Sequence, residues 1–193
     1  RGLMPAGDPR WFVRGPVFIE GDPGSLRTIE QGYVDFLQEH INDPTVRHLL
    51  TSRQPINRDQ EEDWFEEVVA DDEQVNLMIV GDDGPAGPIG IGPVSDPNGS
   101  CEIGIWIREA DWNEGYGTEA SRLVTEYAFD ELRKHRVFAR VFDGNEASKR
   151  IWEKLGFRHE AVHREAAFMH GEYVDVHYYA VLEREWRENR DGE

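Results

Sequence analysis

The chain has 193 residues, 38% of them hydrophobic, which is enough to bury a core as one domain and argues against a disordered protein. Aspartate and glutamate number 39 against 21 lysine and arginine residues, so the formal net charge is −18. Without a basic face nucleic acid is not an expected partner, and no apolar run approaches the roughly 20 residues that span a bilayer.

The N-terminal part predicts a strand followed by two helices. Met4 is one candidate for the natural first residue, with Arg1 to Leu3 added before it; an ordinary ragged terminus is the alternative. Val17–Glu20 is an early strand. The apolar spacing of Leu26–Ile41, after the turn and cap residues 22–25, predicts a helix that Asn42-Asp43-Pro44 ends.

The second helix and a hairpin follow. Asn57-Arg58-Asp59 begins a helix whose buried stripe consists of Trp64, Phe65, Val68 and Val69. Val75–Val80 is a short strand, and Pro88–Gly92 is its partner across the turn Gly81-Asp82-Asp83-Gly84. Glu102–Ile107 then alternates, with Ile103, Ile105 and Ile107 on one face of a strand.

The second half continues with a helix from Thr118 to about Lys134 and a strand over Val137–Phe142. Asn145 caps a short helix that ends at Gly156. Glu160–Phe168 and Tyr173–Leu182 are two closing strands joined at His170-Gly171-Glu172. The simplest organisation is one mixed domain over residues 1–193.

The loop between the strand at 102–107 and the following helix has the composition of an anion site. Gly115 and Gly117 allow backbone conformations closed to other residues and let a ligand approach the main chain. The first N–H groups of a helix lack intrahelical partners, and the helix dipole adds partial positive charge. A pyrophosphate could bind there without a lysine, although a plain turn would have the same sequence.

A family resemblance rests on three further segments. Asn145–Phe157, together with Trp106-Ile107 and Gly115–Ala120, closely resembles the GNAT superfamily of acetyltransferases, and within it the RimJ/RimL type of ribosomal-protein N-terminal acetyltransferases. Asn42–Arg47 and Gly171–Val176 extend the resemblance over most of the chain. It implies an α+β fold: a mixed, mostly antiparallel twisted sheet flanked by helices, whose central parallel strands, 102–107 and 137–142, splay apart.

The resemblance also implies that acetyl-CoA lies in that opening, with no metal. The strand backbone would contact the pantetheine, the loop N–H groups would bind the pyrophosphate, and three residues of the helix that Asn145 caps would lie beside the pantetheine and thioester. In that order these residues are Ile105, Trp106 and Ile107; Asn113, Glu114, Gly115, Tyr116, Gly117 and Thr118; and Asn145, Ser148 and Trp152. Two residues depart from the family pattern. Trp112 stands where Gln or Arg is common, and Glu114 is unfavourable beside a pyrophosphate unless its side chain turns to solvent.

The implied reaction is direct attack of a primary amine on the thioester. Many relatives use a tyrosine as general acid where this chain has Trp152, whose indole does not release a proton at useful pH. The resemblance gives Ser148 that role; a helix-capping serine is the alternative. Glu102 is the best candidate base and Glu165 the second, but an α-amine with pKa about 7.7–8.0 could use water.

Other candidates are weaker. Cys101 is the only cysteine, which excludes an intrachain disulfide framework and favours a cytoplasmic location. As a nucleophile it has no sequence support, since a lone cysteine is usually inert core. His159, His163 and His170 do not have the spacing of a metal site. Exposed aromatic residues such as Tyr178 and Tyr179 could support a homodimer, but strand core explains them equally well.

The acceptor stays open at this level. A protein N-terminus is the leading prediction, and a small amine such as a polyamine or amino sugar is the second. The missing tyrosine leaves a third, a non-catalytic acyl-CoA sensor. We expect specificity to lie before Pro88 and in the hairpin around Gly171.

Lysine is nearly absent: only Lys134, Lys149 and Lys154 accompany 18 arginines. An acid-rich, lysine-poor surface is typical of proteins from salt-in halophiles, in which molar salt screens self-repulsion. An acidic mesophilic protein is the alternative.

Overall fold

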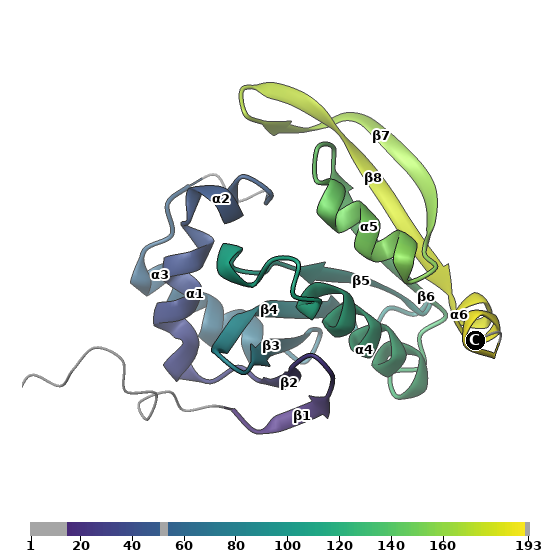
Figure 1. Cartoon of the computed structure of the whole chain (residues 1–193), viewed down its shortest axis with the longest axis horizontal. Helices are drawn as coiled ribbons and strands as arrows, with labels where there is room; N and C mark the ends of the chain where they lie inside the picture. The colour runs from purple at the N-terminus through teal and green to yellow at the C-terminus, as the bar shows by residue number, and fades with distance from the viewer. Residues whose placement is uncertain (1–14, 51–53, 192–193) are drawn as a thin grey trace, which may run out of the picture.

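The computed structural model describes residues 15–50 and 54–191, and Met4 with Arg1 to Leu3 lie outside these residues (Figure 1). One eight-stranded mixed sheet runs in the order β1-β2-β3-β4-β5-β6-β8-β7. Its strands are β1 (Val17–Glu20), β2 (Ser25–Thr28), β3 (Val75–Gly81), β4 (Gly84–Gly92), β5 (Ser100–Ile105), β6 (Arg136–Phe142), β7 (Arg158–Met169) and β8 (Glu172–Leu182).

Helices cover both faces of the sheet. They are α1 (Val34–Ile41), α2 (Pro44–Arg47), α3 (Arg58–Trp64, continued as a π-helix over Phe65–Val69), α4 (Tyr116–Asp130), α5 (Glu146–Lys154) and α6 (Glu183–Asp191). Alternate residues of β3 face opposite sides of the sheet and belong to two different core clusters. Leu77 and Ile79 join the core under α4, α5 and α6, whereas Met78 and Val80 join the core under α1 and α3.

The parallel pair sits at the centre of the sheet and separates after three residues. Ser100, Cys101 and Glu102 of β5 pair with residues 136–138 of β6. Beyond Glu102 the two strands part, and β6 continues to pair with β8 as far as Phe142. This confirms the α+β fold with a mostly antiparallel sheet and splayed central strands.

The predicted helix over 26–41 is wrong in its first half. Ser25–Thr28 form β2, which pairs with Leu77–Val80 of β3, and residues 22–24 are the turn of the β1–β2 hairpin instead of a helix cap. Pairing on both edges satisfies the backbone of β2 and buries Leu26, whose exposed fraction is 1%. A short 3₁₀ helix (Gln31–Tyr33) then leads into α1, and α1 ends before Asn42 as predicted.

Smaller differences concern element ends. Asn57 caps α3 with a full capping box, but the stripe from Trp64 to Val69 is only partly buried. β4 begins four residues before Pro88, and β5 ends at Ile105, so that Trp106 and Ile107 follow the strand. Helix α4 begins two residues earlier than predicted and ends at Asp130. Helices α2 and α6 were not predicted.

No helix within the described ranges is long and apolar enough to cross a membrane.

Candidate active site

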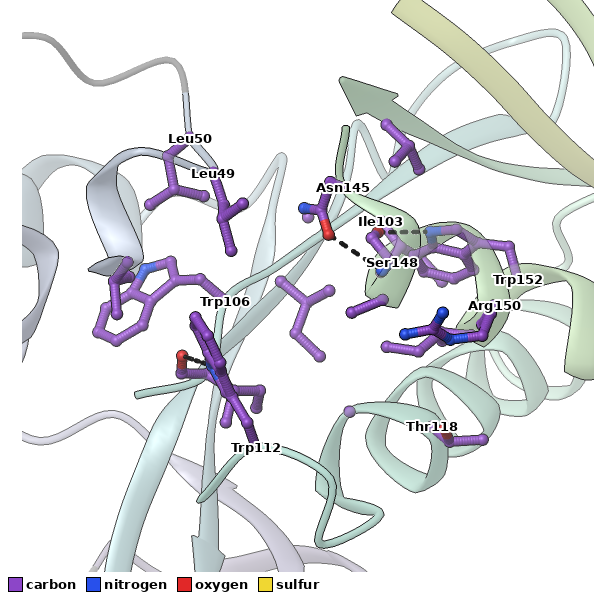
Figure 2. Close-up of a pocket in the computed structure, with 18 of the residues that line it drawn as sticks. Leu49, Leu50, Ile103, Trp106, Trp112, Thr118, Asn145, Ser148, Arg150 and Trp152 are labelled. Atoms are coloured by element: carbon purple, nitrogen blue, oxygen red, sulfur yellow. Dashed lines mark hydrogen bonds between the residues drawn. The ribbon is translucent and has the colours of Figure 1, made fainter. Parts of the chain in front are cut away.

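A cleft of about 740 Å³ opens where β5 and β6 diverge (Figure 2). One wall consists of α5 and the end of β6. The other consists of the end of β5 with the segment around α2, and the start of α4 closes the bottom. Segments that lie far apart in the sequence therefore meet at the point where the sheet leaves its backbone groups unpaired.

The loop before α4 presents several backbone N–H groups to this cleft. Asn113 has φ 66° and Gly115 has φ 90°, and the first intrahelical bond runs from Glu119 N to Gly115 O at 3.0 Å. The N–H groups at 116–118 thus precede the intrahelical hydrogen-bond pattern and lie at the positive end of the helix dipole. Gly117 is close to α5, because a Cβ there would lie 3.0 Å from Cδ1 of Ile151.

The cleft brings together four of the six predicted loop residues: Asn113, Gly115, Gly117 and Thr118. Glu114 and Tyr116 do not line it. Glu114 is exposed, so its carboxylate can turn to solvent and away from a pyrophosphate, which is the orientation that pyrophosphate binding requires. Tyr116 turns its ring against Gly24 and Gly81, beneath the β1–β2 and β3–β4 turns, where a Cβ on Gly81 would overlap it. The Tyr116 side chain therefore supports the loop from behind.

The end of β5 offers backbone groups to the cleft. The N–H groups of Trp106 and Arg108 donate to Pro88 O (3.4 Å) and Ala86 O (2.8 Å) of β4. Successive backbone groups of an extended chain point to opposite edges, so those of Ile105 and Ile107 point away from β4 and into the opening. One of these groups, the Ile107 carbonyl, already accepts a hydrogen bond from the Trp112 indole N–H at 2.8 Å. The atypical Trp112 thus forms part of the cleft wall, as Figure 2 shows.

Helix α5 carries the three helix residues of the predicted site. Asn145 caps it by accepting a hydrogen bond from Ser148 N at 3.1 Å. Trp152 lies one turn further along, with an exposed fraction of 1%, and donates its indole N–H to Ser148 Oγ at 3.2 Å. The Ser148 hydroxyl thus accepts a hydrogen bond within its own helix, and its proton remains for another partner (Figure 2).

Glu102 lines the cleft at the last paired position of β5, and an arginine is bound to it. Its Oε1 accepts a hydrogen bond from Arg140 Nε at 2.6 Å, across the splay from β6. This contact raises the pKa of the Arg140 guanidinium, chiefly through the hydrogen bond to Glu102. The alternative base, Glu165, is on a bulge of β7 with φ 50°, donates its N–H to Asp175 Oδ1 (2.8 Å) and does not line the cleft.

Several lining residues lie outside the motifs. Arg150 and Lys154 are one helical turn apart on α5, and both line the cleft. Leu49 and Leu50, after α2, lie across the cleft from the start of α5 (Figure 2). The spacing of four between Arg150 and Lys154 is the one signal that could have revealed a basic face on α5; no pattern around 49–50 distinguishes them from core leucines.

The weaker candidates lie elsewhere. Cys101 is buried, and burial raises the pKa of its thiol to about 12, so it is a neutral core side chain. His159 contacts His177 (Nε2 to Nδ1, 3.1 Å), whereas His170 contacts His48 O at 3.1 Å. Within the ranges that the structure describes, no three His, Cys, Asp or Glu side chains form a metal-binding group. Tyr179 is buried core, and Tyr178 stacks on Phe138.

Comparisons with known proteins agree on one family. The family model described as "Acetyltransferase (GNAT) domain" matches residues 25–158. YdaF of Bacillus subtilis (strain 168), named "Putative ribosomal N-acetyltransferase", is 33% identical over 124 residues, which cover 64% of this chain and 67% of YdaF. The p20 protein of Bacillus licheniformis, named "Uncharacterized N-acetyltransferase", is 25% identical over 167 residues, which cover 84% of this chain and 94% of p20.

The same fold occurs in a solved structure. Spermidine N-acetyltransferase from Vibrio cholerae, in complex with CoA and spermine, superposes with a TM-score of 0.80 at 19% identity, covering 86% of this chain and 99% of that one. At this identity the likeness speaks for the architecture alone.

Proposed function

The chain belongs to the GNAT family of acetyltransferases and is an acetyl-CoA-dependent enzyme, and we propose that it acetylates the N-terminal α-amine of a protein. One observation carries the proposal. The cleft joins a backbone anion site at the start of α4 to an acceptor side. Each carboxylate that lines this side, among the described residues, binds an arginine.

The described residues fit coenzyme A without a metal. The N–H groups from Asn113 to Thr118 would hold the pyrophosphate, since a helix N-terminus preceded by left-handed residues concentrates donors on an anion. Gly117 leaves the main chain open to the ligand. Arg150 and Lys154 would add positive charge for its phosphates.

The backbone at the end of β5 would hold the pantetheine and polarise the thioester carbonyl. Acetyl-CoA supplies an activated acyl group and a thiol leaving group. The N–H groups of Ile105 and Ile107 point into the cleft, where a fixed donor stabilises negative charge developing on the carbonyl oxygen. The walls also orient both reactants, which supplies much of the rate enhancement in a direct transfer.

Ser148 would give a proton to the departing sulfur. Its Oγ accepts the Trp152 N–H and lines the cleft, so the hydroxyl can rotate its proton toward the sulfur. A thiol, whose pKa is ordinarily about 8.5, leaves readily, so a serine hydroxyl suffices as a donor. This replaces the tyrosine that many relatives have at position 152.

Proton removal from the amine has two routes. Glu102 lies on the acceptor side of β5 and could take the proton, but its Oε1 already accepts a hydrogen bond from Arg140 Nε. An α-amine needs less help than a lysine, because its pKa of about 7.7–8.0 leaves part of it neutral near pH 7.5. Water at the mouth of the cleft can then accept the proton.

The charges of the cleft favour an α-amine over a polyamine. Arg140, Arg150 and Lys154 line it against two carboxylates, Glu102 and Asp111, and Arg108 binds Asp111. Because Arg150 and Lys154 would face the cofactor phosphates and each lining carboxylate already binds an arginine, the described lining leaves no unpaired carboxylate to attract the several positive charges of a polyamine. The name of YdaF, which refers to ribosomal N-acetylation, supports the same acceptor class.

Acetyl transfer to a peptide panel and to an amine panel tests the proposal. Both panels are assayed in dilute and in molar KCl, with thiol release as the readout. We expect turnover on peptides with a free N-terminus and little on spermidine, spermine or amino sugars. Selective turnover on polyamines would contradict the α-amine proposal. Tight acetyl-CoA binding without turnover on any acceptor would instead indicate an acyl-CoA sensor.

We also propose that the protein works in high salt. The support is the excess of 39 acidic over 21 basic residues with only three lysines. A cytoplasmic location, a homodimer and a single domain over 1–193 remain predictions from the sequence.

A further inference from the structure

We propose that the wall around α2 is a subsite for an apolar side chain, so that the preferred acceptor is a protein whose first residue is large and hydrophobic. The inference rests on the proposed function and narrows it. Ile41, Val46, Leu49 and Leu50 line the cleft across from α5, and the Trp106 side chain continues the wall. In Figure 2 Leu49 and Leu50 face Asn145 and Ser148 across the open space.

The position of this wall identifies what it would contact. Asn145 and Ser148 are on the side assigned to the thioester, so a group opposite them belongs to the acceptor and not to coenzyme A. The attacking α-amine must come within about 3–3.5 Å of the thioester carbon. The side chain attached next to that amine would then lie on the side of the cleft that Leu49 and Leu50 line.

The wall is held in place before any acceptor binds. Asn42 joins the two ends of the segment: its Nδ2 donates to Gln38 O (2.6 Å) and Ile56 O (2.7 Å), and its Oδ1 accepts from Ile56 N (2.8 Å). Asp43 caps α2 by accepting from Thr45 N at 2.7 Å. Leu49 N and Leu50 N in turn donate to Val46 O (3.0 Å) and Arg47 O (3.1 Å), so backbone hydrogen bonds connect the apolar residues to the capped turn of α2.

A second contact comes from the other side of the cleft. His170, at the tip of the β7–β8 hairpin, bonds His48 O at 3.1 Å and packs edge-on against the His48 ring, with 4.8 Å between centroids. The segment is therefore held from α1 and from the hairpin. Figure 1 shows the hairpin curving over α5 toward α2. A preorganised apolar surface discriminates between side chains better than a mobile one.

The chemistry of the wall disfavours the alternative occupants. A cationic first side chain would find no unpaired carboxylate in the described lining, because Glu102 and Asp111 already bind arginines. An acidic or hydroxyl side chain would lose water against Ile41, Val46, Leu49 and Leu50, whose side chains offer it no hydrogen-bond partner. Only an apolar side chain gains from the desolvation of this surface.

Peptides that differ only in the first residue test the subsite. We compare kcat/KM for Leu, Met, Ser, Asp and Lys at that position, with wild-type protein in molar KCl. Apolar pockets discriminate by about 10–200-fold per methylene-scale difference, so Leu and Met should exceed Ser by at least about tenfold, with Lys lowest. Equal values for Leu and Ser would overturn the subsite while leaving α-amine acetylation intact. Absence of turnover on all five would overturn both.

Variants then locate the preference. Leu49→Ala and Leu50→Ala should each reduce the Leu-over-Ser ratio at least threefold, with acetyl-CoA affinity unchanged. Val17→Ala, on an exposed position of β1 outside the cleft, is the matched control and should keep the ratio. An unchanged ratio in both leucine variants would overturn the assignment to this wall. Leu50→Met keeps the volume and tests the same position if an alanine variant fails to fold.

Discussion

The hydrogen bond from Trp152 to Ser148 gives the sharpest test of the chemistry. Trp152→Phe keeps an aromatic ring and removes the indole N–H donor, whose nitrogen lies 3.2 Å from Ser148 Oγ. A neutral hydrogen bond contributes about 0.5–1.5 kcal/mol net, and about 1.4 kcal/mol is a factor of ten in rate. If this bond orients the hydroxyl in the transition state, the variant should lose about 3–10-fold in kcat with the KM for acetyl-CoA nearly unchanged.

Ser148→Ala provides the second corner of a double-mutant cycle. It removes the proposed acid and should lower kcat by about 10²-fold, the low end for general acid catalysis, because a thiol is a good leaving group. Asn145 caps α5 through Ser148 N, a backbone group that this substitution retains. In the Ser148→Ala background, Trp152→Phe should have almost no further effect on kcat.

The assay is steady-state thiol release at saturating peptide, with melting curves for each variant. Trp152 is fully buried against Phe157, with 5.0 Å between ring centroids, so the smaller ring should cost about 1–3 kcal/mol of stability. That cost is compatible with a folded protein at the assay temperature. Equal fold-losses for Trp152→Phe in the presence and absence of the Ser148 hydroxyl would refute the coupling between the two side chains.

Three further outcomes follow from the structure. Gly117→Val should abolish acetyl-CoA binding in calorimetry without unfolding the chain, whereas Val17→Ala, at an exposed position outside the cleft, should retain binding. Binding by the Gly117 variant would remove the loop from the site. Burial raises the pKa of Glu61 to about 7 from its ordinary value of 4.5, so the stability that its protonated form contributes is fully present below pH 4.5 and is lost as the pH rises through 7. Glu61→Gln should therefore raise the free energy of unfolding at pH 8 by up to about 3 kcal/mol, measured by urea unfolding. An equal gain at pH 4 would contradict this cause. The melting temperature should rise between 0.1 and 2 M KCl as charge repulsion is screened, and an unchanged value would count against a high-salt habitat.

The elements with local signals were predictable from the sequence. Asn145 and Gly156 bracket α5, and His170-Gly171 joins two strands, because caps and tight turns depend on a few neighbouring residues. The spacing of Leu26, Ile29 and Tyr33 suits a 3.6-residue period, which is why the sequence predicts a helix from Leu26. Residues 25–28 form a strand instead, because they pair with β3, about fifty residues later in the chain.

The candidate site also has parts with local sequence signals and parts without them. The loop at 113–118 and the helix at 145–152 carry motifs that need particular residues at fixed spacing, so the sequence predicts the cofactor side of the cleft. The ion pair between Glu102 and Arg140 joins residues 38 positions apart, and the wall at 41–50 meets α5 only through the fold. Neither has a local pattern, which is why the acceptor side required the structure.

The most direct test of the central claim is to locate the acetyl group on a peptide. One peptide with a free N-terminal leucine and an internal lysine is incubated with acetyl-CoA and the protein in molar KCl, and the product is fragmented by mass spectrometry. We predict a single acetyl group on the α-amine, formed by wild-type protein and at about 10²-fold lower rate by Ser148→Ala. Acetylation of the lysine side chain alone, or no acetylated peptide despite tight acetyl-CoA binding, would contradict it.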